Sequence, residues 1–158
     1  MMHRYKSFIL LPLICLSLNI GKLHAQIAVV VNRDHPSESI KISKLNRIFL
    51  GEIIKWENES ITLVDHKHKS KTTKTFFNRV CGLSQSKVRL KWLGKMLNGD
   101  FQTLPVKLAS DAEILKFVSE NPGAIGFVKS QNLGRLHKLV KVIKIDGKPI
   151  DDPKYPIR

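Results

Sequence analysis

The sequence predicts an α/β fold in which a largely parallel sheet is flanked by helices. Two observations support this prediction. Short apolar runs rich in β-branched residues, such as residues 27–31 and 124–128, alternate with segments that have the apolar spacing of a helix. The composition is that of a globular protein, with 42% hydrophobic and 25% charged residues, and 158 residues leave room for about one domain. These values exclude a disordered tail, a collagen-like rod and a disulfide-rich miniprotein.

The first 25 residues have the layout of a secretory signal peptide. A basic start at residues 3–6 precedes a mostly apolar run over residues 8–20, and Ala25 ends a plausible cleavage site. The apolar run is too short to span a bilayer comfortably, although a retained membrane anchor is the alternative interpretation. We therefore expect a single domain over residues 26–158 that is periplasmic or secreted.

The first half of this domain begins with a strand. Residues 27–31 are continuously apolar, which is typical of a strand covered on both faces. Ser43 is expected to cap a helix that ends near Gly51 and places Leu45, Ile48 and Phe49 toward the core. Residues 61–64 are expected to form a second short strand.

Two helices should follow a polar loop. The first is expected over residues 71–81, with Phe76, Phe77 and Val80 buried. Ser84 should cap the second. Its apolar side is expected to consist of Val88, Trp92, Leu93, Met96 and Leu97, with Lys87, Lys91 and Lys95 forming a basic stripe on the other side.

The last third continues the alternation. Ser110 and Glu113 form a capping box, so a third helix should run to about Glu120. Residues 124–128 are expected to form a buried strand and residues 139–145 an edge strand. The C-terminal residues 151–156 are expected to be an extended surface segment with little helix or sheet.

Charge is distributed unevenly along the chain. The formal net charge is +14, and it falls by three without residues 1–25, which contain Arg4, Lys6 and Lys22 but no acidic residue. Residues 27–64 contain five basic and five acidic residues, whereas residues 66–99 contain nine lysines and arginines and no acid. A surface formed by this segment would attract phosphate, sulfate or an acidic polymer.

The most informative segment is the loop over residues 64–73, because it follows a predicted strand and opens a predicted helix. The first backbone N–H groups of a helix and its dipole favour an anion. Ser70, Thr72 and Thr73 add hydroxyl groups, and Lys67, Lys69, Lys71 and Lys74 surround the same helix start. Such cations are locally unfavourable there, and a bound anion would relieve the conflict. The simpler alternative is that the lysines are only solvated and that Ser70 is a plain helix cap.

Two motifs resemble those of a known family. Residues 48–56, IFLGEIIKW, are similar to the "IFxGxIxxW" segment of phosphate ABC transporter substrate-binding proteins, which belong to the type II periplasmic binding-protein superfamily. Residues 121–128, NPGAIGFV, are similar to the "xPGAIGYV" strand of the same family. The resemblance covers about residues 27–145. It implies one periplasmic-binding-protein-like lobe, with phosphate as ligand and a membrane transporter as partner. Such a module needs no cofactor, and we expect no enzyme activity because His66, His68 and His137 have no spaced nucleophile or paired carboxylate as partner.

The family's phosphate loop reads approximately R-S-D-G-S-G-T-T. Ser70, Thr72 and Thr73 are retained at the matching positions, whereas His66 replaces the arginine, and Lys69 and Lys71 replace the two glycines. The resemblance therefore implies a ligand site at His66, Lys69, Ser70, Lys71, Thr72 and Thr73. The chain is long enough for one of the family's two lobes, which offers half a site unless a homodimer supplies the rest.

Other function classes are less well supported. A non-transport interaction module would use the Lys87, Lys91 and Lys95 stripe together with the loop lysines to dock an acidic macromolecule or envelope partner. Its binding would depend on many lysines and on salt. A metal site at His66 and His68, with His35, lacks a Cys or carboxylate cluster. Nucleic acid is disfavoured by the predicted export and by the lack of aromatic residues interleaved in the basic tract. Cys81 is expected to be a small buried hydrophobe.

Overall fold

The computed structural model describes residues 26–101 and 103–158, so the predicted signal peptide lies outside the described residues. The elements in chain order are β1 (Ile27–Asn32), β2 (Ser39–Ile40), α1 (Ile42–Phe49), β3 (Lys55–Trp56), β4 (Glu59–Ser60), β5 (Thr62–His66), α2 (Lys71–Cys81), α3 (Gln85–Leu97), β6 (Val106–Leu108), α4 (Asp111–Glu120), β7 (Ala124–Lys129), the 3-10 turns η1 (Ser130–Asn132) and η2 (Gly134–Leu139), β8 (Val140–Val142) and β9 (Lys144–Ile145). Within the described ranges, no helix is long and apolar enough to cross a membrane.

The main sheet of the described chain has five strands in the order β6-β5-β7-β1-β8. β5 pairs in parallel with both β6 and β7, while β1 pairs antiparallel with β7 and β8. Four strands therefore run in one direction, and β1 alone runs in the other. The prediction of an α/β fold with a largely parallel sheet is confirmed, and β8 lies at an edge as expected.

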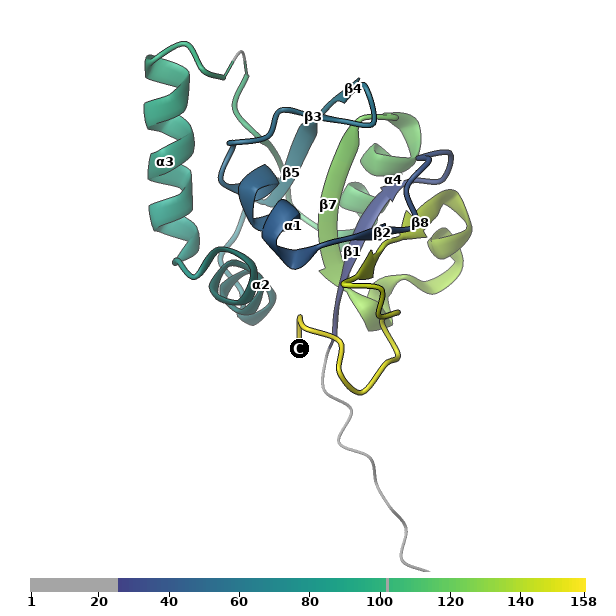
Figure 1. Cartoon of the computed structure of the whole chain (residues 1–158). Helices are drawn as coiled ribbons and strands as arrows, with labels where there is room; N and C mark the ends of the chain where they lie inside the picture. The colour runs from purple at the N-terminus through teal and green to yellow at the C-terminus, as the bar shows by residue number, and fades with distance from the viewer. Residues whose placement is uncertain (1–25, 102) are drawn as a thin grey trace, which may run out of the picture.

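Helices cover both faces of this sheet (Figure 1). Alternate residues of β1 point to opposite faces, as the two-residue period of a strand requires. Val29 and Val31 join the cluster that contains Phe49 of α1 and Phe77 of α2. On the opposite face, residues including Ala28 and Val30 join a second cluster with α4, formed with Ile114, Leu115 and Val118. Both clusters lie within residues 26–158, so this part of the chain contains its own core.

Aromatic residues form the centre of the larger cluster. Phe76 and Phe127 stack with ring centroids 3.7 Å apart, and Phe49 meets the edge of Phe76 at 4.8 Å. The Trp92 Nε1–H donates to the backbone oxygen of Phe49 at 2.7 Å. Such pairs stabilise a core beyond the area they bury. The expected core roles of Trp92, Phe76 and Phe77 are confirmed.

Cys81 is buried at the end of α2, and burial raises the pKa of its thiol to about 12. The thiolate that would act as a nucleophile or metal ligand is therefore disfavoured. The prediction that Cys81 behaves as a small buried hydrophobe is confirmed.

The start of α1 differs from the expectation that Ser43 caps it. The helix begins at Ile42, its N-cap is Lys41, and no side chain of the cap residue bonds to the helix. Instead, the carboxylate of Asp146 accepts a hydrogen bond from the Ile42 N–H at 3.0 Å. An acid from the far end of the chain has replaced the local cap.

One other expectation is wrong, and another is correct only in part. Leu93, Met96 and Leu97 of α3 are exposed, because the buried face of this helix is formed by Gln85, Val88 and Trp92. The C-terminal residues 151–156 contain no helix or strand, as expected, but they are not confined to the surface. Tyr155 is buried, and its hydroxyl donates to the backbone oxygen of Ile27 at 3.0 Å. The aromatic ring stabilises the segment by filling space at the start of β1.

Candidate functional site

The start of α2 is closed by a reciprocal capping box. The Ser70 Oγ accepts a hydrogen bond from the Thr73 N–H at 3.2 Å, and the Thr73 Oγ1 accepts one from the Ser70 N–H at 2.8 Å. The Thr73 hydroxyl in turn donates to the Ser70 backbone oxygen at 2.9 Å. Thr73 is buried and its side chain is committed to the cap, whereas Ser70 is exposed. Two of the predicted ligand residues thus also define where the helix begins.

The surface around this cap is positively charged. Lys69 and Lys71 flank Ser70, and both side chains are exposed, as are those of Lys67 and Lys74. The first turn of α2 contains no acidic residue. The helix dipole places positive partial charge at the same point, and the amides of Lys71 and Thr72 have no partner within the helix. The arrangement favours an anion close to Ser70.

His66 and Thr72 lie beneath this surface and not on it. Both are buried. The His66 Nε2 is 2.9 Å from the backbone oxygen of Phe127 and 3.6 Å from Oδ1 of Asp111. Since a carbonyl can only accept, this contact requires a proton on Nε2. In this arrangement His66 links the ends of β5 and β7 to the start of α4.

Asp65 is the buried anion of the region. Its side chain is fully buried and accepts hydrogen bonds from Nε and Nη2 of Arg89 at 2.9 and 2.8 Å. The Gln85 amide nitrogen donates to the same carboxylate at 3.0 Å. Arg89 also donates to the backbone oxygen of His66. The positive partner of Asp65 is therefore Arg89 of α3, and not one of the loop lysines close to it in the sequence.

Sequence reasoning did not identify Arg89 and Gln85 as residues that hold the site. A signal was present, because Asp65 is the only acidic residue between Glu59 and Asp100. A buried acid in that position requires a positive partner. Nine basic residues in the following segment were candidates, and helical periodicity alone does not select one of them.

A second helix begins at the same end of the sheet. β5 and β6 are parallel neighbours, and the Lys67 N–H donates to the Leu108 backbone oxygen at 2.7 Å, which joins the segments leading to α2 and α4. The Ser110 Oγ caps α4 through the Glu113 N–H at 3.2 Å. The Asp111 carboxylate accepts from the Lys129 N–H at 3.1 Å and from the Asn132 side chain at 2.7 Å.

The three histidines considered as metal ligands, His35, His66 and His68, have separate surroundings. The His35 ring contacts that of Trp56 in a tilted arrangement, with ring centroids 4.2 Å apart. Burial, followed by the charge of Lys141, lowers the pKa of His35. His66 contacts Phe127 and Asp111, while His68 is exposed on the loop. Among the residues that the structure describes, no three His, Cys, Asp or Glu side chains are grouped so as to hold a metal ion.

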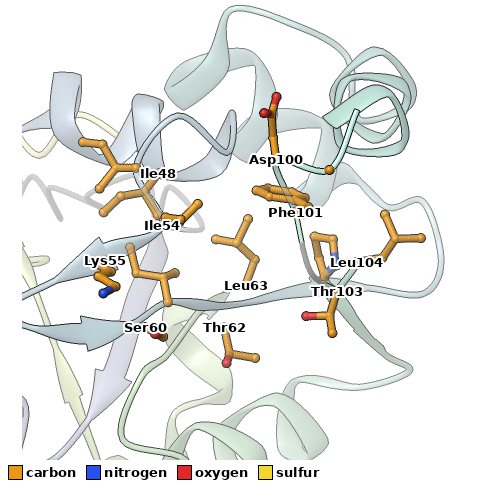
Figure 2. Close-up of a pocket in the computed structure, with 14 residues that line it drawn as sticks. Ile48, Ile54, Lys55, Ser60, Thr62, Leu63, Asp100, Phe101, Thr103 and Leu104 are labelled. Atoms are coloured by element: carbon orange, nitrogen blue, oxygen red, sulfur yellow. The ribbon is translucent and has the colours of Figure 1, made fainter. Parts of the chain in front are cut away.

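A pocket of about 400 Å³ lies at the opposite end of β5. Figure 2 shows Ile54, Leu63 and Phe101 gathered between α1, β5 and the segment after α3. Thr62 and Leu63, the first residues of β5, line it, whereas α2 follows the last residue of that strand. None of the predicted ligand residues lines this pocket.

No family model matches the chain, and no curated protein matches it. Solved structures do. A candidate phosphate ABC transporter substrate-binding protein from Clostridium perfringens, solved with bound phosphate, superposes with a TM-score of 0.63 at 18% identity, over 79% of this chain and 46% of that one. An ABC-type phosphate transport receptor from Vibrio cholerae gives 0.61 at 20%, over 79% and 48%. PstS from Borrelia burgdorferi gives 0.63 at 15%, over 84% and 53%.

The chain therefore spans about half the length of these proteins. At such low identity the similarity establishes the fold and leaves the ligand to be argued from the residues present. The described domain has the α/β fold found in phosphate-binding proteins of this type, with a mostly parallel central sheet flanked by helices.

Proposed function

We propose that the chain is an exported solute-binding protein that holds phosphate or a similar oxyanion at the start of α2. The observation that carries this proposal is the exposed Ser70 between Lys69 and Lys71, at a helix start that has no acid of its own. The structural neighbours are phosphate-binding proteins, and this supports phosphate as the first anion to test.

The ligand would be held by groups of three kinds. The backbone N–H groups of Lys71 and Thr72 would donate to its oxygens, and the Ser70 hydroxyl would add a further donor. Lys69 and Lys71 would supply charge. Because lysine binds phosphate as a point charge and no arginine fork is present on the loop, affinity should exceed selectivity among oxyanions.

The other predicted ligand residues have supporting roles in this proposal. Thr73 defines the cap that places the free amides, and Thr72 contributes its backbone and not its buried hydroxyl. His66 and the Asp65–Arg89 pair hold the end of β5 from which the loop leaves. A site of this kind is open on one side, so a second lobe or a homodimer would strengthen binding by covering it.

The cellular role that fits this proposal is phosphate uptake outside the cytoplasm, in partnership with a membrane transporter. The structural neighbours are described as transport receptors and transporter-associated proteins, which is the reason to propose it. The predicted signal peptide is consistent with a periplasmic or secreted location.

Calorimetric titration of residues 26–158 with inorganic phosphate, at low and moderate salt, tests the proposal. We expect saturable heat that Ser70→Ala abolishes or strongly reduces. Ser110→Ala is the matched control, because Ser110 caps α4 in the same way but has no flanking lysine. Absence of heat at millimolar phosphate, or equal heat from Ser70→Ala, would overturn the proposal.

A second candidate function is an interaction module that docks an acidic macromolecule through its basic surface. The acid-free segment over residues 66–99 favours it. Binding of this kind should decline gradually as lysines are removed and should depend steeply on salt. Small-anion binding should instead depend on Ser70 and on the two lysines beside it, Lys69 and Lys71.

A further inference from the structure

Helix α3 presents a row of exposed apolar side chains. Leu90 and Leu97 are 67% and 78% exposed, and Leu93 and Met96 are 44% and 41% exposed. Leu90, Leu93 and Leu97 are three and four residues apart, so they share one face of the helix. An exposed apolar row of this length on a small domain generally marks a contact surface.

Lysines lie beside this row. Lys87 and Lys91 are exposed and one helical turn apart, and Lys95 continues the same line with partial exposure. α3 contains no acidic residue. Glu52 and Asp100 line a small pocket together with Lys91 and Lys95, so the lysine farthest from these acids along α3 is Lys87. We call Leu90, Leu93, Met96, Leu97, Lys87, Lys91 and Lys95 the leucine–lysine face.

We propose that the leucine–lysine face docks the protein on an anionic phospholipid surface. A helix that combines exposed leucines with adjacent lysines can lie in the plane of a bilayer interface, with the leucines at the acyl boundary and the ammonium groups at the headgroups. Lysine side chains reach from such a helix to phosphate groups along their apolar stems.

The position of α3 agrees with a lipid surface as the partner. The helix stands at the edge of the molecule (Figure 1). Its buried residues Val88 and Trp92 belong to the core cluster that contains Phe77 of α2. The exposed leucines of α3 line neither the pocket at the start of β5 nor the small pocket beside Glu52. A protein helix generally docks into a groove, whereas a flat bilayer needs none.

Charge disfavours a second copy of the chain as the occupant. Two copies joined through this face would bring their Lys87 and Lys91 side chains together in a protein whose net charge is already strongly positive. An anionic lipid surface has the opposite sign, and each lysine near it strengthens binding by about fivefold. The inference does not depend on phosphate binding at α2.

Vesicle flotation with residues 26–158 tests this proposal. We expect the protein to float with vesicles of equal phosphatidylglycerol and phosphatidylcholine, and not with phosphatidylcholine alone. Leu90→Gln combined with Leu97→Gln should weaken binding about tenfold. Lys87→Gln combined with Lys91→Gln should weaken it about 25-fold, which is about fivefold for each lysine. Leu139→Gln and Lys116→Gln, which change an exposed leucine on η2 and an exposed lysine on α4, are the matched controls and should bind like the unchanged protein.

A fluorescent label distinguishes insertion of the α3 leucines into the bilayer from simple electrostatic attraction to its surface. Leu97→Cys labelled with an environment-sensitive dye should shift to shorter wavelength on anionic vesicles, and the buried Cys81 should remain unlabelled. The proposal is overturned if the leucine variants float as well as the unchanged protein, or if the unchanged protein does not float. A dimer in sedimentation velocity that the leucine variants dissociate would also overturn it, in favour of a self-association surface. Circular dichroism and phosphate titration should be unchanged in all variants.

Discussion

The starts of α2 and α4 are alike in geometry and opposite in charge. Each follows one of two neighbouring parallel strands, and each is capped by a serine whose hydroxyl accepts from the N–H three residues later. The first turn of α4 carries Asp111 and Glu113, whereas that of α2 carries no acid and is surrounded by exposed lysines. The chain neutralises the dipole of α4 with its own carboxylates.

This difference separates a helix start with a structural role from one suited to an external anion. At α4, the Glu113 carboxylate accepts from the Ala109 N–H at 3.0 Å and Asp111 bonds to Lys129. At α2, the nearest buried carboxylate is Asp65, and it is occupied by Arg89 and Gln85. The positive end of α2 therefore has no acidic residue in its own first turn, and this is the feature on which the proposed anion site rests.

Removal of Arg89 should have the largest effect, because the α2 region depends on it. Arg89→Ala leaves the fully buried Asp65 carboxylate without its positive partner, and we expect the free energy of unfolding to fall by about 3–5 kcal/mol. Denaturant titration measures this loss. Arg79→Ala, an exposed arginine on α2, should change stability by less than about 0.5 kcal/mol. Equal effects of the two variants would contradict the assigned role of Arg89.

Asp111 should contribute to stability through its position in the first turn of α4. The first turn of α2 has no acidic side chain that could do the same. Asp111→Ala removes a carboxylate that accepts two hydrogen bonds and interacts with the helix dipole, so we expect a loss of about 2 kcal/mol. Thermal unfolding measures this loss. Glu120→Ala, at the opposite end of α4, should be neutral or slightly stabilising because an acid there opposes the dipole. A neutral Asp111→Ala would remove the contrast between the two helix starts.

Loss of either serine cap should lower stability by the same amount, but the two variants should differ in their response to phosphate. Ser70→Ala and Ser110→Ala should each lower stability by about 1 kcal/mol, because each removes one side-chain cap. Millimolar phosphate should raise the melting temperature of the unchanged protein and of Ser110→Ala, and not that of Ser70→Ala. If both variants respond to phosphate alike, the anion binds elsewhere.

Lys71→Glu should have the smallest effect on stability, and it should stabilise the protein instead of destabilising it. Lys71→Glu replaces a cation with an anion at the first position of α2, so stability without phosphate should rise by about 0.3–1 kcal/mol. Phosphate binding should be lost in the same variant. Lys116→Glu in the interior of α4 is the control, since charge there is away from the first turn. A destabilised Lys71→Glu would show that the start of α2 is already neutralised.

Local signals predicted the elements that carry the proposed site. The bounds of α2 agree with the expected residues 71–81, because Ser70 caps the helix at one end and Gly82 adopts the left-handed conformation that ends it at the other. The apolar run at residues 124–128 predicts the strand β7, and the expected positive surface of the loop is present as exposed lysines. Helix caps and hydrophobic runs act over a few residues, so the sequence expresses them directly.

The contacts that hold these elements together join residues far apart in the chain. Arg89 was not predicted as the partner of Asp65, nor Asp146 as the group that bonds to the start of α1. Short strands such as β6 were missed for the same reason, since three residues carry too little pattern and depend on pairing with β5.

The sequence alone determined the α/β class, the order of the main helices and strands, the uneven charge and the lysine-rich helix start, because each depends on residue type and short-range spacing. The tertiary structure alone decided that His66 faces inward, that the Tyr155 side chain is buried in the core, and that the leucines of α3 are exposed. Periodicity shows which residues share a helix face. The contact of Trp92 with Phe77 and its hydrogen bond to the Phe49 backbone oxygen determine which of those faces is buried.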